Sequence, residues 1–141
     1  MSQGADQTTA RRSASMAAVG VTSLDSIVPA LRDAARAHAG LQLLVLHGSR
    51  ARGEAHAGSD WDFGYLAAPG TEIASLHADL SLALGTDAID LADLRSAGGL
   101  LRYRVARDGL VLFERDAQLF DKFWFDAVSF RCDASPVLRA G

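Results

Sequence analysis

Gly48 and Ser49 are followed, after ten further residues, by Asp60 and Asp62, with a tryptophan between the two acids. Aspartates two residues apart on a strand point to the same face of a sheet, and Mg²⁺ takes carboxylate oxygens readily as ligands. A Gly-Ser turn that opens a helix offers backbone N–H groups and a hydroxyl to phosphate oxygens. Two Mg²⁺ ions about 3.5–4 Å apart can then align a triphosphate with an attacking hydroxyl. The pattern therefore indicates metal-dependent nucleotidyl transfer.

A third carboxylate for such a site is expected on another strand. Residues 88–94 predict that strand, and Asp90 alternates there with apolar residues. We expect Asp90 to share a sheet face with Asp60 and Asp62. Asp93 is the alternative third acid, but it lies on the opposite face of the strand if the first two acids set the register.

The remaining elements follow from hydrophobic periodicity. The apolar run of residues 41–47 is bounded by glycines and predicts a buried strand, so the Gly-Ser pair opens the turn after it. Aromatic residues alternate with acids in residues 60–67, which predicts a second strand. Apolar residues at helical or strand spacing, with capping and stop residues, predict the other elements. These are a helix over 22–39 capped by Thr22 or Ser23, a helix over 71–84 opened by Thr71, a helix over 96–106, a strand over 110–114 and a helix after Asp116.

This order of elements predicts an α/β (α+β) fold, with a small mixed sheet flanked by helices. At 141 residues the chain has the size of one domain, which we expect to span residues 21–141. Residues 1–20 are expected to form a disordered tail. Met16 stands just before the patterned region and is an alternative start.

The composition of the chain limits the kinds of partner and environment that we expect for it. The net charge of -3 gives no general attraction to nucleic acid, although the basic residues are almost all arginine, which can contact a phosphate locally. No apolar run approaches the ~18 residues that span a bilayer. The single cysteine, Cys132, cannot form an intrachain disulfide and fits a reducing cytoplasm.

Two stretches carry a resemblance to a known family. Residues 47–54 (HGSRARGE) and 58–63 (GSDWDF) resemble the signature of the minimal nucleotidyltransferase (MNT) branch of the DNA polymerase β-like nucleotidyltransferase superfamily, and a looser similarity runs from Leu24 to Asp116. The resemblance implies a polymerase β-like core that uses ATP and two Mg²⁺ ions. It implies that Gly48 and Ser49 hold the triphosphate, that Asp60 and Asp62 bridge the metals, and that Asp90 ligates the catalytic metal and helps to deprotonate the attacking hydroxyl.

The residues around the motif have alternative roles. Arg50 and Arg52 follow the phosphate turn, and we expect at least one of them to contact the nucleotide, although such arginines are usually solvated. Ser59 either contacts the nucleotide or hydrogen-bonds the turn. Ser49 alone would be a helix N-cap. The histidines at positions 47 and 56 and the glutamate at position 54 are expected to be structural or exposed.

The resemblance also implies a partner. Proteins of the MNT branch are commonly antitoxins that transfer AMP from ATP to a tyrosine of a HEPN-domain ribonuclease toxin, with release of pyrophosphate. The small chain leaves little room for a separate acceptor-binding module, which agrees with an acceptor that brings its own surface. The alternatives are transfer to a small hydroxyl compound, as in aminoglycoside nucleotidyltransferases, and a non-catalytic antitoxin that acts by docking.

The last predicted helix carries an aromatic stripe that we expect to be core, formed by Phe120, Phe123, Trp124, Ala127 and Phe130. Two further apolar residues lie off this stripe, so the helix is apolar on more than one side. That leaves room for a homo- or hetero-oligomeric interface.

Overall fold

The computed structural model describes residues 24–134, with side chains described as far as residue 129. Several expectations lie outside these residues: the tail over residues 1–20, the start at Met16 and the caps Thr22 and Ser23. The side chains of Phe130 and Cys132 lie outside them too.

The centre of the fold is a four-stranded sheet with the order β3-β2-β1-β4. Strands β1 (Leu41–His47) and β2 (Trp61–Ala67) pair antiparallel, and β4 (Leu110–Glu114) pairs antiparallel with the other edge of β1. Strand β3 (Ile89–Asp93) runs parallel to β2. The expected mixed sheet is therefore confirmed.

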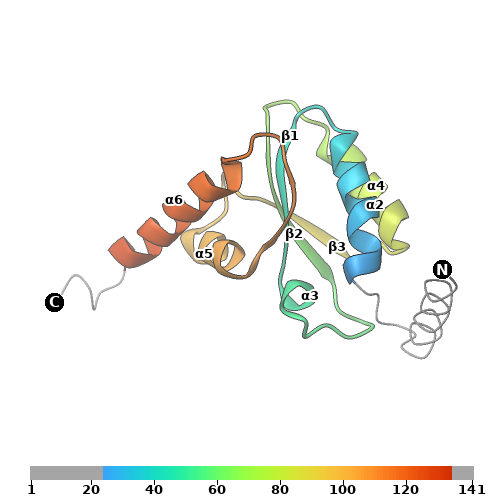
Figure 1. Ribbon diagram of the computed structural model, residues 1–141, viewed down its shortest axis with the longest axis horizontal. Coiled ribbons are helices and arrows are strands. Elements are labelled where there is room, and N and C mark those ends of the chain that lie inside the picture. The colour runs from blue at the N-terminus through green and yellow to red at the C-terminus, as the bar shows by residue number, and fades with distance from the viewer. Residues whose placement is uncertain (1–23, 135–141) are drawn as a thin grey trace, which may run out of the picture.

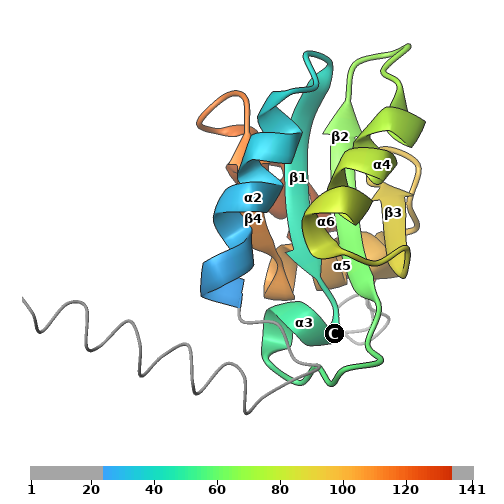
Figure 2. The same cartoon turned by 90° about the vertical axis from the view of Figure 1, so that its right-hand side faces the viewer.

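Helices cover both faces of this sheet. Helices α2 (Leu24–Arg36) and α4 (Ile73–Leu84) lie on one face, and α5 (Gly99–Asp108) and α6 (Leu119–Ala134) lie on the other (Figure 1). The short helix α3 (Ser49–Arg52) lies at the end of β1, beside the start of β2 (Figure 2). No helix within residues 24–134 combines the length and apolarity that a membrane crossing requires.

Each face has its own apolar core, which follows from the two-residue alternation of the strands. Leu44, Leu46 and Phe63 are fully buried on the face under α2 and α4. Leu43 and Val45 are fully buried on the face under α5 and α6. Asp62 of β2 and Asp90 of β3 lie on this second face too, outside its apolar core.

Several predicted boundaries needed correction. The helix expected over 96–106 begins at Gly99, because Gly98 is its extended N-cap, and continues to Asp108. The helix expected from residue 71 begins at Ile73, since the Thr71 hydroxyl donates to the Ala68 carbonyl at 2.6 Å instead of capping it. The first helix ends at Arg36, three residues earlier than expected.

The aromatic stripe of the last helix was predicted only in part. Phe123 and Ala127 are buried under the sheet, and Phe120 packs against them. Trp124 is 45% exposed, although the periodicity placed it in the core, and Phe125 is 66% exposed. A helix that is apolar on more than one side does not reveal by its spacing which side the sheet will cover.

Candidate active site

The strand register brings three polar residues into one row across the sheet. His47 of β1 pairs with Asp62 of β2, and Asp62 pairs with Asp90 of β3. Residues that pair in register point to the same face, and neighbouring strands lie about 4.8 Å apart. Asp93 pairs with Tyr65 and so faces the opposite side of the sheet, where its side chain is exposed. Of the two candidates for the third acid, Asp90 is therefore the one beside Asp62.

Gly48 forms the turn between β1 and α3, directly after His47. Its backbone has φ 76° and ψ -162°, a combination that is essentially restricted to glycine. A Cβ atom built on Gly48 would lie 2.4 Å from Oδ2 of Asp62. The turn therefore approaches the carboxylate so closely that no side chain fits between them. Ser49 is the first residue of α3, and Gly48 rather than Ser49 is its N-cap.

A pocket of about 300 Å³ opens over this row. It is formed by the end of β1, the turn and α3, the two acids, and one face of α5. Its lining residues are His47, Gly48, Arg52, Asp62, Asp90, Leu101, Arg104 and Asp108. The pocket thus joins carboxylates, arginines and a glycine turn, and arginines and carboxylates are the groups that phosphates and divalent cations respectively take as partners.

The Asp62 carboxyl lies close to two other carboxyl groups, those of Asp60 and Asp90. Burial raises the pKa of the Asp62 carboxyl above its ordinary value, and the neighbouring Asp90 and Asp60 carboxylates raise it further against the opposing effects of His47 and Arg52. Both other predicted acids are therefore close enough to repel Asp62. A cation bound among the three would relieve that repulsion.

His47 is buried beside the acids, with 8% of its surface exposed. Burial lowers the pKa of its imidazole, and this effect outweighs the opposing ones of Asp62, a hydrogen bond to the backbone of Phe63, and Asp90. Nε2 of His47 has no hydrogen-bond partner among the described residues. His47 was expected to be structural or exposed, but it lines the pocket with an unsatisfied nitrogen.

The pKa of Asp62 leads to a prediction about stability. The folded protein holds the Asp62 proton more tightly than the unfolded chain does, so this group favours folding below its ordinary pKa of 3.8 and disfavours it as pH rises through the folded pKa. Asp62→Asn should therefore raise the Tm at pH 7 in the absence of divalent cations. The difference from wild type should shrink as pH falls and approach zero below 3.8, where the carboxyl is protonated in the folded and the unfolded chain alike. Thermal melts across this range test the prediction, and a pH-independent difference would contradict it.

Asp60 and Ser59 lie just before β2, at the edge of the site. Asp60 is exposed and is not among the pocket-lining residues, although its charge acts on Asp62. The Ser59 hydroxyl accepts a hydrogen bond from the His56 N–H at 2.9 Å. Of the two roles expected for Ser59, this contact supports the one in the turn.

Arg50 is placed differently from the sequence expectation. Its guanidinium donates to the Ser59 carbonyl at 2.8 Å and lies 4.1 Å from the centre of the Trp61 ring. Trp61 belongs to the core under α2 and α4, so Arg50 braces the connecting loop instead of lining the pocket. Arg52 does line the pocket, where it pairs with Glu54 at 3.0 Å and approaches Asp108 at 3.9 Å.

Helix α5 supplies pocket residues that the motif did not reveal. Leu101, Arg104 and Asp108 follow one another at spacings of three and four residues, which puts them on one helix face. That spacing is visible in the sequence. It gains meaning only when α5 is known to pack on the same side of the sheet as the acids.

The donor chemistry at this site fits Mg²⁺. Mg²⁺ is usually held by one or two carboxylates together with water and substrate phosphates, and not by an all-protein cage. Asp62 and Asp90 supply two adjacent carboxylates with a third, Asp60, close by. Within residues 24–129 no three such side chains are already gathered around one point.

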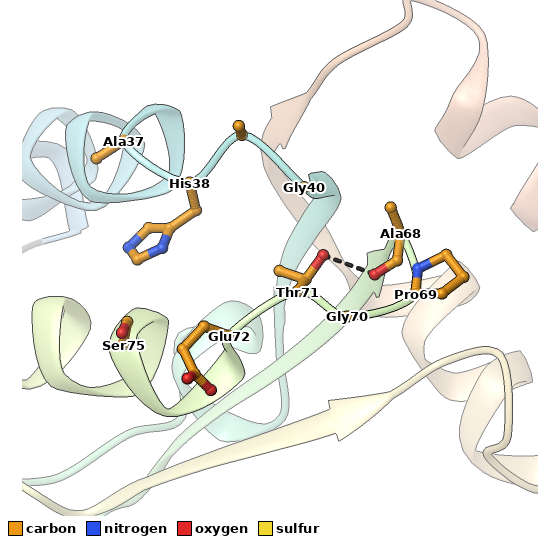
Figure 3. Close-up of a pocket in the computed structure, with 10 residues that line it drawn as sticks. Ala37, His38, Gly40, Ala68, Pro69, Gly70, Thr71, Glu72 and Ser75 are labelled. Atoms are coloured by element: carbon orange, nitrogen blue, oxygen red, sulfur yellow. Dashed lines mark hydrogen bonds between the residues drawn. The ribbon is translucent and has the colours of Figure 1, made fainter.

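A second hollow, of about 500 Å³, lies at the opposite ends of β1 and β2 (Figure 3). Glu72 is its one carboxylate, and neither arginine nor lysine lines it. The hydroxyl of Thr71 is directed to the Ala68 carbonyl, and Nε2 of His38 lies 2.7 Å from the carboxylate of Asp79. This hollow lacks the groups that a nucleotide and a metal require.

Comparison with known proteins agrees with this geometry. Residues 30–118 match the sequence profile of the family described as polymerase beta, nucleotidyltransferase. The chain is 35% identical over 96 residues to the protein adenylyltransferase MntA of Aphanizomenon flos-aquae (strain 2012/KM1/D3). This match covers 59% of the chain and 63% of the relative, which is less than two thirds of the relative's length.

Solved structures share the fold. A chain in the crystal structure of a toxin–antitoxin with AMP-PNP superposes with a TM-score of 0.65 at 30% identity, covering 80% of this chain and 93% of that one. The toxin–antitoxin MntA-HepT gives a TM-score of 0.61 at 28% identity, with coverages of 82% and 93%. A chain in a structure of tri-AMPylated Shewanella oneidensis HEPN toxin in complex with MNT antitoxin gives a TM-score of 0.55 at 29% identity, covering 82% of this chain and 89% of that one.

Proposed function

Because the chain belongs to the polymerase beta nucleotidyltransferase family, we propose that it transfers AMP from ATP to a hydroxyl of a HEPN-domain toxin and so acts as an antitoxin. The observation that carries the reaction is the register of Asp62 with Asp90, with Gly48 against Asp62. The acceptor is supported by the similarity to the adenylyltransferase MntA and to the complex that contains an AMPylated HEPN toxin.

In the proposed reaction the acceptor oxygen attacks the α-phosphorus of ATP. A new P–O bond forms, the bond from the α-phosphorus to the bridging oxygen breaks, and pyrophosphate leaves. Asp90 accepts the proton of the attacking hydroxyl, as a carboxylate exposed at the edge of the pocket. We assign the β- and γ-phosphates to the turn at Gly48 and Ser49, of which Gly48 lines the pocket, and Arg52 lines the pocket nearby while paired with Glu54.

Asp60, Asp62 and Asp90 are the residues that would hold Mg²⁺. When bound, the metal ions would neutralise the triphosphate and stabilise charge on the attacking and leaving oxygens. Asp62 is fixed for this role by its place on β2 and by the close approach of Gly48. We further propose that the reaction takes place in the cytoplasm, where ATP and Mg²⁺ are available.

The test is transfer of label from ATP to a purified toxin. The full chain is incubated with Mg²⁺, the cognate HEPN-domain protein and ATP that carries the label either on the α- or on the γ-phosphate. Label from the α-phosphate should appear on the toxin, and label from the γ-phosphate should appear in pyrophosphate. Transfer of the γ-label would mean kinase chemistry, and no transfer of either label, with an active MntA–toxin pair as control, would contradict the proposal.

A further inference from the structure

Arg104 of α5 lines the pocket together with Asp62 and Asp90, and its side chain has no partner among the described residues. Every other arginine side chain within residues 24–129 donates at least one hydrogen bond to the protein. Arg104 makes no such bond and no ion pair among the described residues. Arg104 is exposed and lines the pocket, so its guanidinium N–H groups are available to an anion that enters there.

The charges around Arg104 indicate the kind of ligand. Asp62 and Asp90 line one side of the pocket, and a phosphate chain that approaches them is repelled. The charge of Arg52 is already shared between Glu54 and Asp108. Arg104 is thus the pocket arginine whose charge is available to an incoming anion.

The helix that carries Arg104 is held firmly enough to position it. Val105, its neighbour in the chain, is fully buried in the core under α5 and α6, and Ala106 is also buried there. Arg102 further fixes the helix, because its guanidinium donates to the Leu94 carbonyl and lies 5.0 Å from the centre of the Phe123 ring. Arg104 therefore stands on a well-packed helix and lines the same pocket as Gly48.

From this arrangement we infer that Arg104 is a substrate-binding residue that contacts the β- or γ-phosphate of ATP in the pocket that Gly48 also lines. The inference rests on the proposed function, which assigns these phosphates to the Gly48–Ser49 turn. A guanidinium can donate two parallel hydrogen bonds to a phosphate, which an ammonium cannot. Arg104 would hold the pyrophosphate half of the substrate and leave the α-phosphorus to the acids.

Nucleotide binding by the full chain, measured by calorimetry at fixed Mg²⁺, tests this role without any acceptor. Arg104→Ala should weaken ATP binding by about 10-fold to 100-fold, the loss expected for a charge-assisted hydrogen bond. AMP binding should change little, because AMP lacks the β- and γ-phosphates. Arg104→Lys should recover part of the affinity for ATP. In transfer assays Arg104→Ala should raise the KM for ATP more than it lowers kcat.

The matched control is Arg36→Ala, which removes an exposed arginine of α2 whose one partner within residues 24–129 is Asp33 of its own helix. It should leave ATP binding unchanged. Equal weakening of ATP and AMP, or unchanged ATP binding in Arg104→Ala, would overturn the inference. A wild-type chain that binds ATP but labels no toxin would contradict the proposed acceptor alone, and a wild-type chain that binds no ATP would overturn both.

Discussion

Asp62→Asn and Asp90→Asn, tested one at a time, are each expected to lower AMP transfer by about 10³-fold or more while the chain stays folded. The two carboxylates pair in register on neighbouring strands, and asparagine keeps their shape but removes the charge that would hold Mg²⁺. A loss of several kcal/mol of transition-state stabilisation corresponds to this factor. The loss is measured as the initial rate at which the α-phosphate label is transferred to the toxin, compared with the wild-type rate.

Asp93→Asn is the matched control for Asp90→Asn. Asp93 lies on the same strand and is exposed like Asp90, but it pairs with Tyr65 on the opposite face and its carboxylate accepts the Arg95 N–H at 2.9 Å. Transfer by Asp93→Asn should stay near the wild-type rate. Equal losses in the two variants would mean that the acids act through general charge and not through the row with Asp62.

The same variants separate catalysis from docking. A variant of Asp62 or Asp90 that no longer transfers AMP should still bind the toxin, because the substitutions are confined to the pocket. If such a variant also leaves the toxin active, the chemistry is what neutralises it. If the variant still neutralises the toxin, docking is sufficient, and the antitoxin role of the proposed reaction is contradicted.

The sheet was the part of the fold that the sequence predicted best. Strand β1 is a run of apolar residues between Gly40 and Gly48, and its observed bounds are the predicted ones. The alternation of side chains along β3 predicted that Asp90 and Asp93 point to opposite faces of the sheet, because the side-chain period of a strand is two. The register in the structure supports the same choice.

The side chains around the motif were harder to predict, for a physical reason. Arg50 directly follows the Gly48–Ser49 turn, but α3 has only four residues, and sequence adjacency does not say which way such a short helix points a side chain. In the fold Arg50 stacks on Trp61, and the pocket arginines are Arg52 and Arg104. Arg104 is far from the motif in the chain and joins it only through the packing of α5 on the sheet.

Gly48→Ala is expected to lower both transfer and stability, and it tests how closely the turn approaches Asp62. Alanine at φ 76° and ψ -162° costs about 1–3 kcal/mol of backbone strain. Its Cβ would stand 2.4 Å from Oδ2 of Asp62, so the carboxylate or the turn must move as well. A displacement on the order of 1 Å at a catalytic group can cost about 100-fold in rate. We therefore expect at least that loss in α-label transfer, together with a lower Tm.

Gly53→Ala distinguishes the close approach from backbone strain alone. Gly53 has the same φ of 76° at the other end of α3, but a Cβ built there has no atom within 4 Å. Alanine at Gly53 should lower the Tm through the cost of the left-handed conformation, about 1–2 kcal/mol, and leave transfer near the wild-type rate. If Gly53→Ala and Gly48→Ala reduce transfer equally, the effect comes from destabilising α3. If Gly48→Ala alone loses transfer, the contact between the turn and Asp62 is what the reaction requires.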